Sequence, residues 1–338
     1  MFDEKYIELL FDNFSRRKVL IIGDVMIDAY LWGEVDRISP EAPVPVVALK
    51  KRDSRLGGAA NVALNIQSLG ATPYLCSVIG QDEKSKQFLS LLQERGMPAE
   101  GIISSPDRIT TVKFRIIGNN AQLLRVDEEN EHDLVESETL ALFGRISQMI
   151  EKGLADVIIF EDYNKGVITP ELIKWVVDMA RTKGIPVVVD PKKKNFLHYH
   201  GVDLFKPNMK ELREGLKLDG ETQTMEEVSQ AVALLQQKLG AGMVLTTLSD
   251  KGIYFRKLRP DGQTESGHFA AHLRQISDVS GAGDTVISIA ALCMAAGAEA
   301  PFIAQLANLG GGLVCEQVGV VPINKELLRQ EALQILGQ

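Results

Sequence analysis

The sequence has few cysteines and no long apolar run. Cys76, Cys293 and Cys315 are the three cysteines among 338 residues, and no two of them have the C-x-x-C spacing. Isolated thiols in apolar surroundings indicate buried side chains in a reducing compartment, so we expect a cytoplasmic protein. The acidic, amphipathic segment 1–11 is unlike a signal peptide. No segment approaches the ~20 apolar residues of a membrane-spanning helix, so we expect no membrane role.

Several motifs of nucleotide-binding and hydrolytic proteins are also missing. No glycine is followed directly by lysine, which excludes the P-loop pattern and means that any kinase of this sequence uses another phosphate cradle. Neither G-x-G-x-x-G nor G-x-S-x-G occurs, which disfavours a dinucleotide dehydrogenase and a hydrolase. His268 and His272 have the spacing of a zinc helix, but Phe269 stands where a metalloprotease has glutamate. We therefore expect no zinc site there.

Positive charge is scarce as well. The chain has 37 Lys and Arg residues against 45 Asp and Glu residues, a net charge of −8. This balance argues against a basic face for nucleic acid, and an anionic substrate needs a local basic pocket. A hydrophobic share of 45% and a charged share of 24% are ordinary for a globular protein. We expect one domain over residues 1–338, with one large α/β core and an insertion.

Short β-rich runs alternate with longer helical patterns. This alternation predicts βαβ units, hence an α/β fold with a mostly parallel central sheet flanked by helices. The expected strands are 19–23, 74–78, 157–160, 187–190 and 243–246, and the clearest expected helices are 85–95, 133–152, 170–183, 225–239 and 324–336. Polar residues end three of the strands, at Asp24, Glu161 and Asp190. Because ligands bind beyond the carboxyl ends of parallel strands, we expect these residues to line one crevice.

Two stretches interrupt this alternation and predict a small β-lid at about 30–56 and 108–128. Residues 42–49 form a proline-marked extended edge, and residues 110–117 alternate strictly before a Gly118-Asn119-Asn120 turn. Val112, Phe114 and Ile116 form one apolar face of this lid, with Lys113 and Arg115 on the other. The two cations are either solvated or in contact with a substrate. The apolar face and free strand edges predict a homodimer through the lid.

The segment Asp278–Asp284 is a loop of small residues that runs straight into an apolar helix. Gly281, Ala282 and Gly283 let backbone N–H groups point inward, and the helix N-terminus adds partial positive charge for a phosphate. Asp284 then lies beside an anion hole, where a carboxylate can accept the proton of an attacking hydroxyl. The alternative is an acidic cap after a glycine turn.

A second glycine motif precedes an apolar helical pattern that stops at Gly70. Gly57 and Gly58 let a sugar approach the backbone, and the amide of Asn61, in the first turn, can donate to and accept from hydroxyls. The alternative is close packing of the helix on the sheet, with Asn61 as a capping residue.

With both glycine motifs in this order, the chain resembles the PfkB, or ribokinase-like, carbohydrate kinases over about residues 19–322. The resemblance implies ATP and Mg²⁺ as cofactors, Asp284 as catalytic base and residues 281–283 as the anion hole. It also implies that Asn208 and Glu211 organise magnesium and phosphates, although both fit a helix-start cap. The resemblance implies a nucleotide loop with Thr247, Ser249 and Gly252, for which an ordinary turn is the alternative. It places Asn308 at the start of the adenine-side helix, where an ordinary polar helix residue is the alternative. Ser280 replaces the family's usual threonine, and Glu316-Gln317 replaces an expected basic residue.

Four further runs resemble the members of this family that phosphorylate heptose 7-phosphate. They are Gly23–Asp28, Arg37–Val46, Asp162–Gly166 and Asp190–Lys192, and the second is the most specific. The resemblance implies phosphorylation of the anomeric hydroxyl to heptose 1,7-bisphosphate, for ADP-heptose and lipopolysaccharide core synthesis. No H-x-G-H nucleotidyltransferase signature occurs, so we expect a separate partner enzyme to complete that pathway. A kinase for another sugar and a noncatalytic sugar-phosphate sensor are the alternatives.

On this reading the sugar lies between the lid and the sheet. Asp24 and Asp28 accept hydrogen bonds from its hydroxyls, beside Gly57, Gly58, Asn61 and Asp190. Candidate cations for its phosphate are Arg37, Lys113, Arg115, Arg125, Lys165 and Lys192. The sequence alone does not choose among them.

Overall fold

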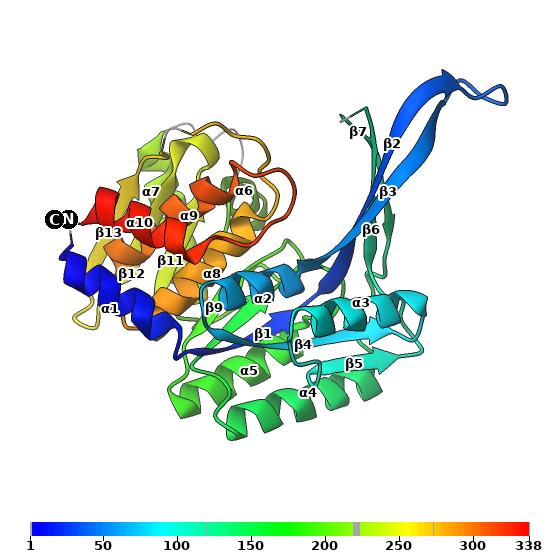
Figure 1. Cartoon of the computed structure of the whole chain (residues 1–338). Coiled ribbons are helices and arrows are strands. Elements are labelled where there is room, and N and C mark those ends of the chain that lie inside the picture. Colours follow the sequence, from blue (N-terminus) through cyan, green and yellow to red (C-terminus); the bar gives the residue numbers. More distant parts are fainter. Residues whose placement is uncertain (1, 120, 219–223, 273, 338) are drawn as a thin grey trace.

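The computed structural model describes residues 2–119, 121–218, 224–272 and 274–337, so Asn120 of the predicted turn lies outside the described residues. A nine-stranded sheet runs through the molecule in the order β13–β12–β11–β10–β9–β8–β1–β4–β5 (Figure 1). Its strands are β1 (Lys18–Gly23), β4 (Thr72–Gly80), β5 (Ile102–Ser105), β8 (Val157–Glu161), β9 (Val187–Asp190), β10 (Leu204–Phe205), β11 (Met243–Thr247), β12 (Ile253–Leu258) and β13 (Thr264–Phe269). Neighbours from β5 to β11 pair in parallel, and β12 and β13 extend one edge antiparallel.

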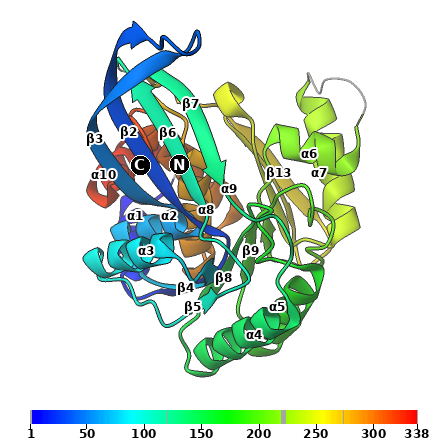
Figure 2. The same cartoon turned by 90° about the vertical axis from the view of Figure 1, so that its right-hand side faces the viewer.

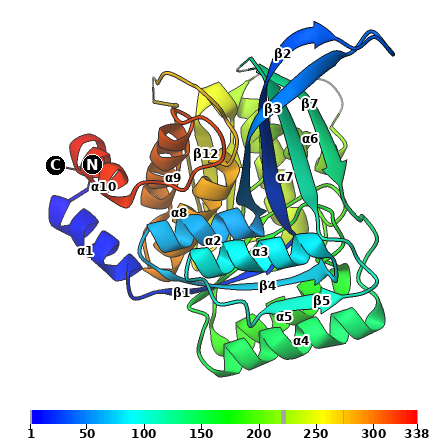
Figure 3. The same cartoon turned by 45° about the vertical axis from the view of Figure 1, so that its right-hand side comes forward.

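Helices cover both faces of this sheet, which explains why its central strands are apolar throughout. One face packs against α1 (Glu4–Phe14), α2 (Ala59–Ser68), α3 (Glu83–Glu94), α8 (Ala282–Ala295), α9 (Ala300–Val314) and α10 (Lys325–Leu336). The other packs against α4 (Glu136–Glu151), α5 (Pro170–Lys183), α6 (Met209–Leu216) and α7 (Met225–Leu239). Figure 3 shows α2 and α3 on the opposite side of β4 from α4 and α5.

The predicted strands and helices are all present, with ends shifted by a few residues. The sequence patterns do not predict β5, β10, β12 and β13. β10 has two residues, too few to show a period, and β13 is a half-exposed edge strand of sequence TESGHF with no apolar run. Among the described residues, no helix is long and apolar enough to cross a membrane.

A second sheet, the lid sheet, projects from the main body in the order β3–β2–β6–β7 (Figures 1 and 2). Its strands are β2 (Val25–Ile38), β3 (Pro45–Gly58), β6 (Val112–Gly118) and β7 (Ala121–Glu128). The β2–β3 hairpin follows β1 directly and returns directly into α2, so the lid sheet begins at the polar end of the central strand. The division into one domain with a lid stays a prediction.

Cross-strand pairing assigns the lid residues to two faces. Lys113 and Arg115 lie on the face of Asp28 and Tyr30, and Phe114 and Ile116 lie on the other. The expected exposed apolar face needs a correction, because Val112 is fully buried within the chain. The apolar exposure is greatest on β7, where Leu124 and Val126 are 55% and 46% exposed.

Candidate active site

Asp284 lies buried in the first turn of α8, held by two side chains from distant segments. Asn61 Nδ2 donates to its Oδ2 over 2.6 Å, and the hydroxyl of Tyr163 donates to its Oδ1 over 3.0 Å. The cap of α8 is Gly281, with φ of 80°, and no side chain caps this helix end. The capping alternative for Asp284 is therefore wrong, because its carboxylate bonds to side chains from α2 and from the end of β8.

The loop before α8 presents backbone amides as predicted, with one correction. The N–H of Ala282 donates to Val279 O over 3.3 Å, so this amide is used inside the loop. The first helical bond runs from Thr285 N to Gly281 O. The amides of Gly283 and Asp284 therefore have no partner within the helix and can serve an anion. Gly281 is needed for its left-handed φ, which other residues rarely adopt.

Burial raises the pKa of Asp284 to about 6, and the hydrogen bond from Asn61 opposes this rise. The nearby carboxylate of Asp190 raises the pKa further, and the hydrogen bond from Tyr163 lowers it. At neutral pH the carboxylate is thus mostly ionised, with a proton affinity higher than that of an exposed aspartate. A general base needs this combination, because it must be deprotonated before the reaction and accept a proton during it.

Three buried carboxyl groups meet behind the loop. One oxygen each of Glu161, Asp190 and Asp284 lie within 4.8 Å of one another, and Lys206 Nζ is 2.9 Å from Asp190 Oδ2. Within the described part of the chain, neither oxygen of Glu161 has a hydrogen-bond partner. Burial and the charge of Asp190 hold the pKa of Glu161 well above its usual range. The protonated form of Glu161 is therefore favoured more than in an exposed glutamate, which lowers the repulsion among the three carboxyl groups.

Asn208 and Glu211 form a capping box at the start of α6. Asn208 Oδ1 accepts from Glu211 N over 2.9 Å, and Glu211 Oε2 accepts from Asn208 N over 2.8 Å. Glu211 Oε1 also accepts from Lys192 Nζ over 2.8 Å. The cap alternative for this pair is thus correct as local structure. Amide and carboxylate oxygens are also the ligand atoms that Mg²⁺ prefers, so the same two residues are suited to bind the magnesium ion of a bound nucleotide.

The implied nucleotide loop follows β11 and lies beside Asn208. Thr247 pairs with Asn208 in an isolated bridge, and its N–H donates to Pro207 O over 3.1 Å. Gly252 has a φ of 90°, and a Cβ there would lie 2.1 Å from Phe269 O, so only glycine fits. Ser249, the first residue of a 3₁₀ turn (η1, Ser249–Lys251), is exposed.

Asn308 approaches the same loop from the other side but does not begin a helix. Its Nδ2 donates to Ala270 O over 2.8 Å, and Ala270 also lies against Gly252. Helix α9 starts at Ala300, so the expected position of Asn308 at a helix start is wrong. Pro301 in the first turn marks the true start, since proline is favoured there.

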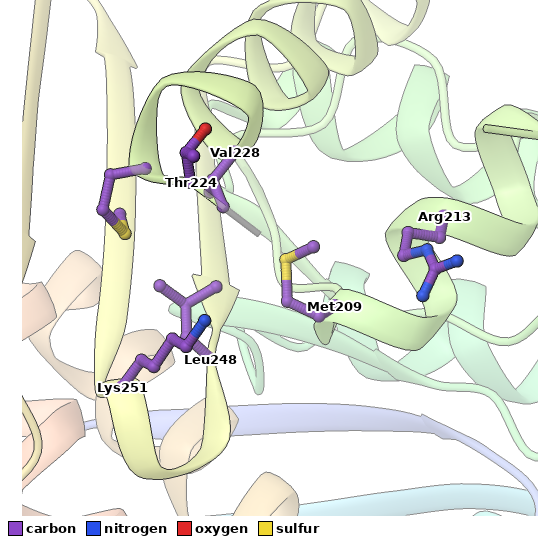
Figure 4. Close-up of a pocket in the computed structure, with 7 residues that line it drawn as sticks. Met209, Arg213, Thr224, Val228, Leu248 and Lys251 are labelled. Carbon is purple, nitrogen blue, oxygen red and sulfur yellow. The ribbon is translucent and has the colours of Figure 1, made fainter. Parts of the chain in front are cut away.

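A cavity of about 210 Å³ lies behind the nucleotide loop, between α6, α7 and the turn at 248–251 (Figure 4). Met209, Arg213, Thr224, Met225, Val228, Leu248 and Lys251 line it. None of these residues contacts Asp284 or the lid cations in the hydrogen bonds and ion pairs described. The cavity is therefore separate from the buried centre of the candidate site.

Only glycine fits at positions 57 and 58, because a Cβ at either position would collide with a neighbouring aspartate. A Cβ on Gly57 would lie 2.3 Å from Asp28 Oδ2, and one on Gly58 would lie 2.5 Å from the carbonyl of Asp24. Gly58 also has a φ of 58°. These close contacts are with strand β2 and Asp24 and not with a helix, so the packing that requires the glycines differs from the helix-on-sheet packing of the alternative. Asn61, in contrast, points toward Asp284, and its Oδ1 is buried without a partner among the described residues.

Asp24 holds the backbone after β8, which is not the role expected for it. Its carboxylate accepts from the N–H groups of Tyr163, Lys165 and Val167 at 2.8, 3.1 and 3.1 Å. Burial and the neighbouring Asp162 raise the pKa of Asp24 to about 6. The three amides fix Asp24 as a support for residues 163–167, and its contact with a sugar hydroxyl stays a prediction.

The lid sheet brings some of the candidate cations together. Arg115 pairs with the buried Asp28, and Arg125 lies directly opposite Arg115 on β7. Lys113 pairs with Asp127 at 3.1 Å and Glu129 at 3.3 Å. Arg125 pairs with Asp127 at 2.9 Å, so each of the two opposite arginines has a carboxylate partner while both remain on one lid face.

Other candidate cations lie elsewhere. Lys165 pairs with Glu129 and Glu131 at 2.7 and 2.9 Å, and Lys192 lies beside Glu211. Arg37 is exposed near the far end of β2, nine positions after Asp28, which is about 30 Å along a strand. Within one chain, Arg37 is therefore not brought to this site, contrary to the expected substrate contact.

The crevice expected at the strand ends contains Glu161 and Asp190, which lie together with Asp284. The sequence patterns do not distinguish Tyr163 or Lys206. Tyr163 lies within the run Asp162–Gly166 and Lys206 shortly before Asn208, and neither position carries a local signal of function. Each gains its place in the site from a distant partner, Asp284 for Tyr163 and Asp190 for Lys206.

Residues 16–326 match the family model described as pfkB family carbohydrate kinase. The chain is 39% identical to the bifunctional protein HldE of Methylobacillus flagellatus over 97% of its own length and 66% of the relative. It is 40% identical to HldE of Caulobacter vibrioides over 90% of its length and 61% of the relative. The chain thus spans less than two thirds of the length of these curated relatives.

Solved structures are similar over almost the whole chain. Phosphofructokinase-2 of Escherichia coli, in complex with potassium, has a TM-score of 0.75 at 17% identity and covers 93% of this chain and 97% of its own. Ribokinase of Arabidopsis thaliana, complexed with ribose and ATP, has a TM-score of 0.70 at 19% identity, over 93% and 99%. These similarities confirm the ribokinase-like α/β fold. Together with the family match over most of its length, they identify the chain as a member of the pfkB family of carbohydrate kinases, phosphotransferases with an alcohol group as acceptor.

Proposed function

We propose that this protein transfers the γ-phosphoryl group of ATP to the anomeric hydroxyl of D-glycero-D-manno-heptose 7-phosphate, giving heptose 1,7-bisphosphate. The observation that carries the proposal is the arrangement at Asp284: a buried carboxylate with a raised pKa lies beside first-turn amides and opposite a lid face that carries arginines. Heptose as the sugar is supported by the similarity to HldE proteins and by the run Arg37–Val46.

Asp284 is the proposed base. It accepts the proton of the anomeric hydroxyl as that oxygen attacks the γ-phosphorus, and the first-turn amides of Gly283 and Asp284 donate to the phosphoryl oxygens. Asn61 holds one carboxylate oxygen, and its own unpartnered Oδ1 can accept from a neighbouring sugar hydroxyl. Asp28 is the proposed acceptor for another sugar hydroxyl. It lies near the start of β2, where the lid sheet leaves the main body, and its carboxylate is beside Gly57.

Arg115 and Arg125 are the proposed contacts of the sugar phosphate. The two residues lie opposite each other on adjacent strands of the same lid face, and a dianionic phosphate can accept charge-assisted hydrogen bonds from both, in place of or beside Asp28 and Asp127. Lys113 belongs to the same face, although two carboxylates already pair with it. This arrangement favours a phosphorylated sugar over a free one.

Asn208, Glu211, Thr247, Gly252 and Asn308 are the proposed nucleotide-side residues. Asn208 and Glu211 orient the magnesium ion, and Lys192 and Lys206 offset the charge of the phosphates from the side of Asp190. Magnesium bound with ATP supplies charge neutralisation at the transferring phosphoryl group.

A second copy of the chain is the proposed partner of the lid. Leu124 and Val126 expose apolar side chains on the outermost lid strand, whose free edge can pair with or pack against the same strand of another copy. A separate nucleotidyltransferase as the next enzyme and a cytoplasmic location also stay predictions.

The test is ATP consumption by the purified protein with a panel of heptose 7-phosphate, fructose 6-phosphate, ribose and free heptose. We expect the highest kcat/KM with heptose 7-phosphate. Higher efficiency with fructose 6-phosphate or ribose contradicts the substrate and leaves the family assignment intact. Binding of a sugar phosphate without ATP consumption indicates a noncatalytic sensor.

A further inference from the structure

Tyr163 contacts the proposed base but has no assigned role. Its hydroxyl donates to Asp284 Oδ1 over 3.0 Å, while Asn61 donates to Oδ2 over 2.6 Å. A carboxylate offers about four lone-pair positions, so both oxygens keep capacity for one further donor. The two hydrogen bonds thus restrict the carboxylate without blocking it.

The ring of Tyr163 is held from several sides. Its backbone N–H donates to Asp24 Oδ2 over 2.8 Å, and Lys192 Nζ lies 5.2 Å from the ring centroid. The preceding residue, Asp162, is anchored by Asn195 and Tyr199 at 3.0 and 2.8 Å. The contacts of residues 162–163 and the hydrogen bond to Asp284 together orient the phenol toward Asp284.

The hydroxyl of Tyr163 remains a donor at any physiological pH. Burial holds the pKa of Tyr163 well above its usual range, and the charges of Asp284, Glu161 and Asp190 add to this rise. Tyr163 is therefore not an acid or base in the reaction. Its hydrogen bond stabilises the ionised form of Asp284.

We propose that Tyr163 is a positioning residue for phosphoryl transfer, which fixes one oxygen of Asp284 and keeps this carboxylate in the ionised form that accepts the sugar proton. The inference rests on the proposed role of Asp284. It does not depend on which sugar is the substrate.

Tyr163→Phe tests the proposal, with Tyr254→Phe as the matched control. Both tyrosines donate a hydroxyl to another side chain, but Tyr254 donates to Ser229 Oγ over 2.9 Å and not to Asp284. A hydrogen bond to a charged group contributes roughly 1.5–3 kcal/mol, so Tyr163→Phe should lower kcat about ten- to a hundredfold. The KM values for sugar and ATP should change less than about threefold. Tyr254→Phe should lower the melting temperature and keep kcat per folded molecule.

The pH dependence of kcat separates positioning from general support of the fold. Asp284 faces the carboxyl groups of Glu161 and Asp190, the ammonium groups of Lys206 and Lys192, and the Tyr163 phenol. Wild-type kcat should fall as the pH drops below about 6, where Asp284 becomes protonated. Loss of the Tyr163 donor favours the protonated form, so this acid limb should move to higher pH in Tyr163→Phe. The acid limb should stay in place in Tyr254→Phe.

A kcat within twofold of wild type and an unmoved acid limb would overturn the proposal. If Tyr163→Phe does not fold, 3-fluorotyrosine at position 163 keeps the shape and donates more strongly, and it should move the acid limb to lower pH. If no sugar in the panel supports turnover, the proposed function fails. The inference is then tested by infrared spectroscopy of the Asp284 carboxyl group, whose stretching band is assigned by its loss in Asp284→Asn. This band should titrate at higher pH in Tyr163→Phe than in wild type.

Discussion

The buried centre around Asp284 and the polar face of the lid sheet use charged side chains in different ways. At Asp284 each carboxylate oxygen has its own partner, Asn61 for one and Tyr163 for the other, while Asn61 Oδ1 and both oxygens of Glu161 have none among the described residues. On the lid, carboxylates are shared: Asp127 accepts from both Lys113 and Arg125, and Glu129 accepts from both Lys113 and Lys165.

The difference follows from solvent. In the buried centre, breaking a hydrogen bond to Asp284 leaves a buried polar group unpaired at a cost of about 1–3 kcal/mol, so Asn61 and Tyr163 are held in place. On the lid, Lys113, Asp127 and Glu129 keep 14–22% of their side chains exposed and Arg125 keeps 52%, so water screens these charges in part. Each shared carboxylate has a second cation, so a lid cation that turns to a phosphate leaves its carboxylate paired. The fold thus combines a fixed buried centre, the proposed catalytic site, with a more adaptable polar face on the lid.

Asp284→Asn should have the largest effect and tests the rigid half of this comparison. Loss of a general base typically lowers turnover ~10²–10⁴-fold, and we expect a loss in this range with little change in sugar affinity. Burial raises the pKa of Asp284 to about 6, so the native carboxylate binds its proton more tightly than the unfolded chain does. The contribution of the Asp284 proton to the free energy of unfolding is therefore greatest below the pKa of the unfolded chain. This contribution falls as the pH rises through about 6. The variant should be at least as stable as wild type at pH 7–8.

The matched control is Glu138→Gln. Glu138 is also a buried carboxylate in the first turn of a helix, but it closes a capping box by accepting from Val135 N over 2.9 Å. We expect a stability loss of about 1 kcal/mol with turnover retained. Turnover of Asp284→Asn within a few-fold of wild type, with the fold intact, means that Asp284 is not the base.

Arg115→Ala and Arg125→Ala should give the next largest effects and compare two positions on the lid. Arg115 is half-buried and paired with Asp28, whereas the side chain of Arg125 is 52% exposed. A charge-assisted hydrogen bond of about 1.5–3 kcal/mol corresponds to a ten- to hundredfold rise in KM for the sugar phosphate. We expect this rise for Arg115→Ala and a smaller one for Arg125→Ala. Equal KM values for phosphorylated and free sugar in wild type would contradict a phosphate site here.

Leu124→Lys combined with Val126→Lys should change the assembly more than the chemistry. Two charges on the exposed lid strand oppose its burial against a second copy. We expect wild type to have a dimer mass by light scattering at micromolar concentration and the double variant to have half that mass. A wild-type monomer over this range rejects the lid dimer.

Arg37→Ala should have the smallest effect on catalysis. Because Arg37 lies near the far end of β2, about 30 Å from Asp28, we expect kcat and KM within about twofold of wild type in a monomeric variant. Steady-state kinetics in the Leu124→Lys, Val126→Lys background measures this directly. A large rise in KM that appears only in the dimer shows that the tip of the β2–β3 hairpin reaches the site of the other copy.

The sequence by itself determined the local features of this protein. Alternating apolar runs fixed the central strands, and apolar periodicity together with Thr169 and Pro170 fixed where α5 begins. The small residues of 281–283 and 57–58 identified the two motifs, because Gly281 and Gly58 adopt a positive φ and a Cβ on Gly57 would lie 2.3 Å from Asp28 Oδ2. These features depend on neighbours a few positions away, so a linear pattern contains them.

The tertiary structure alone decided which side chains meet. Asn61 and Asp284 are 223 positions apart, and Tyr163 and Asp284 are 121 apart, yet all three share one hydrogen-bonded centre. The pairing of β8 with β1 brings Tyr163 to Asp24, and the length of the β2–β3 hairpin carries Arg37 away. Such contacts depend on strand order and helix packing, whose free energy is distributed over the whole core, so no local spacing reveals them.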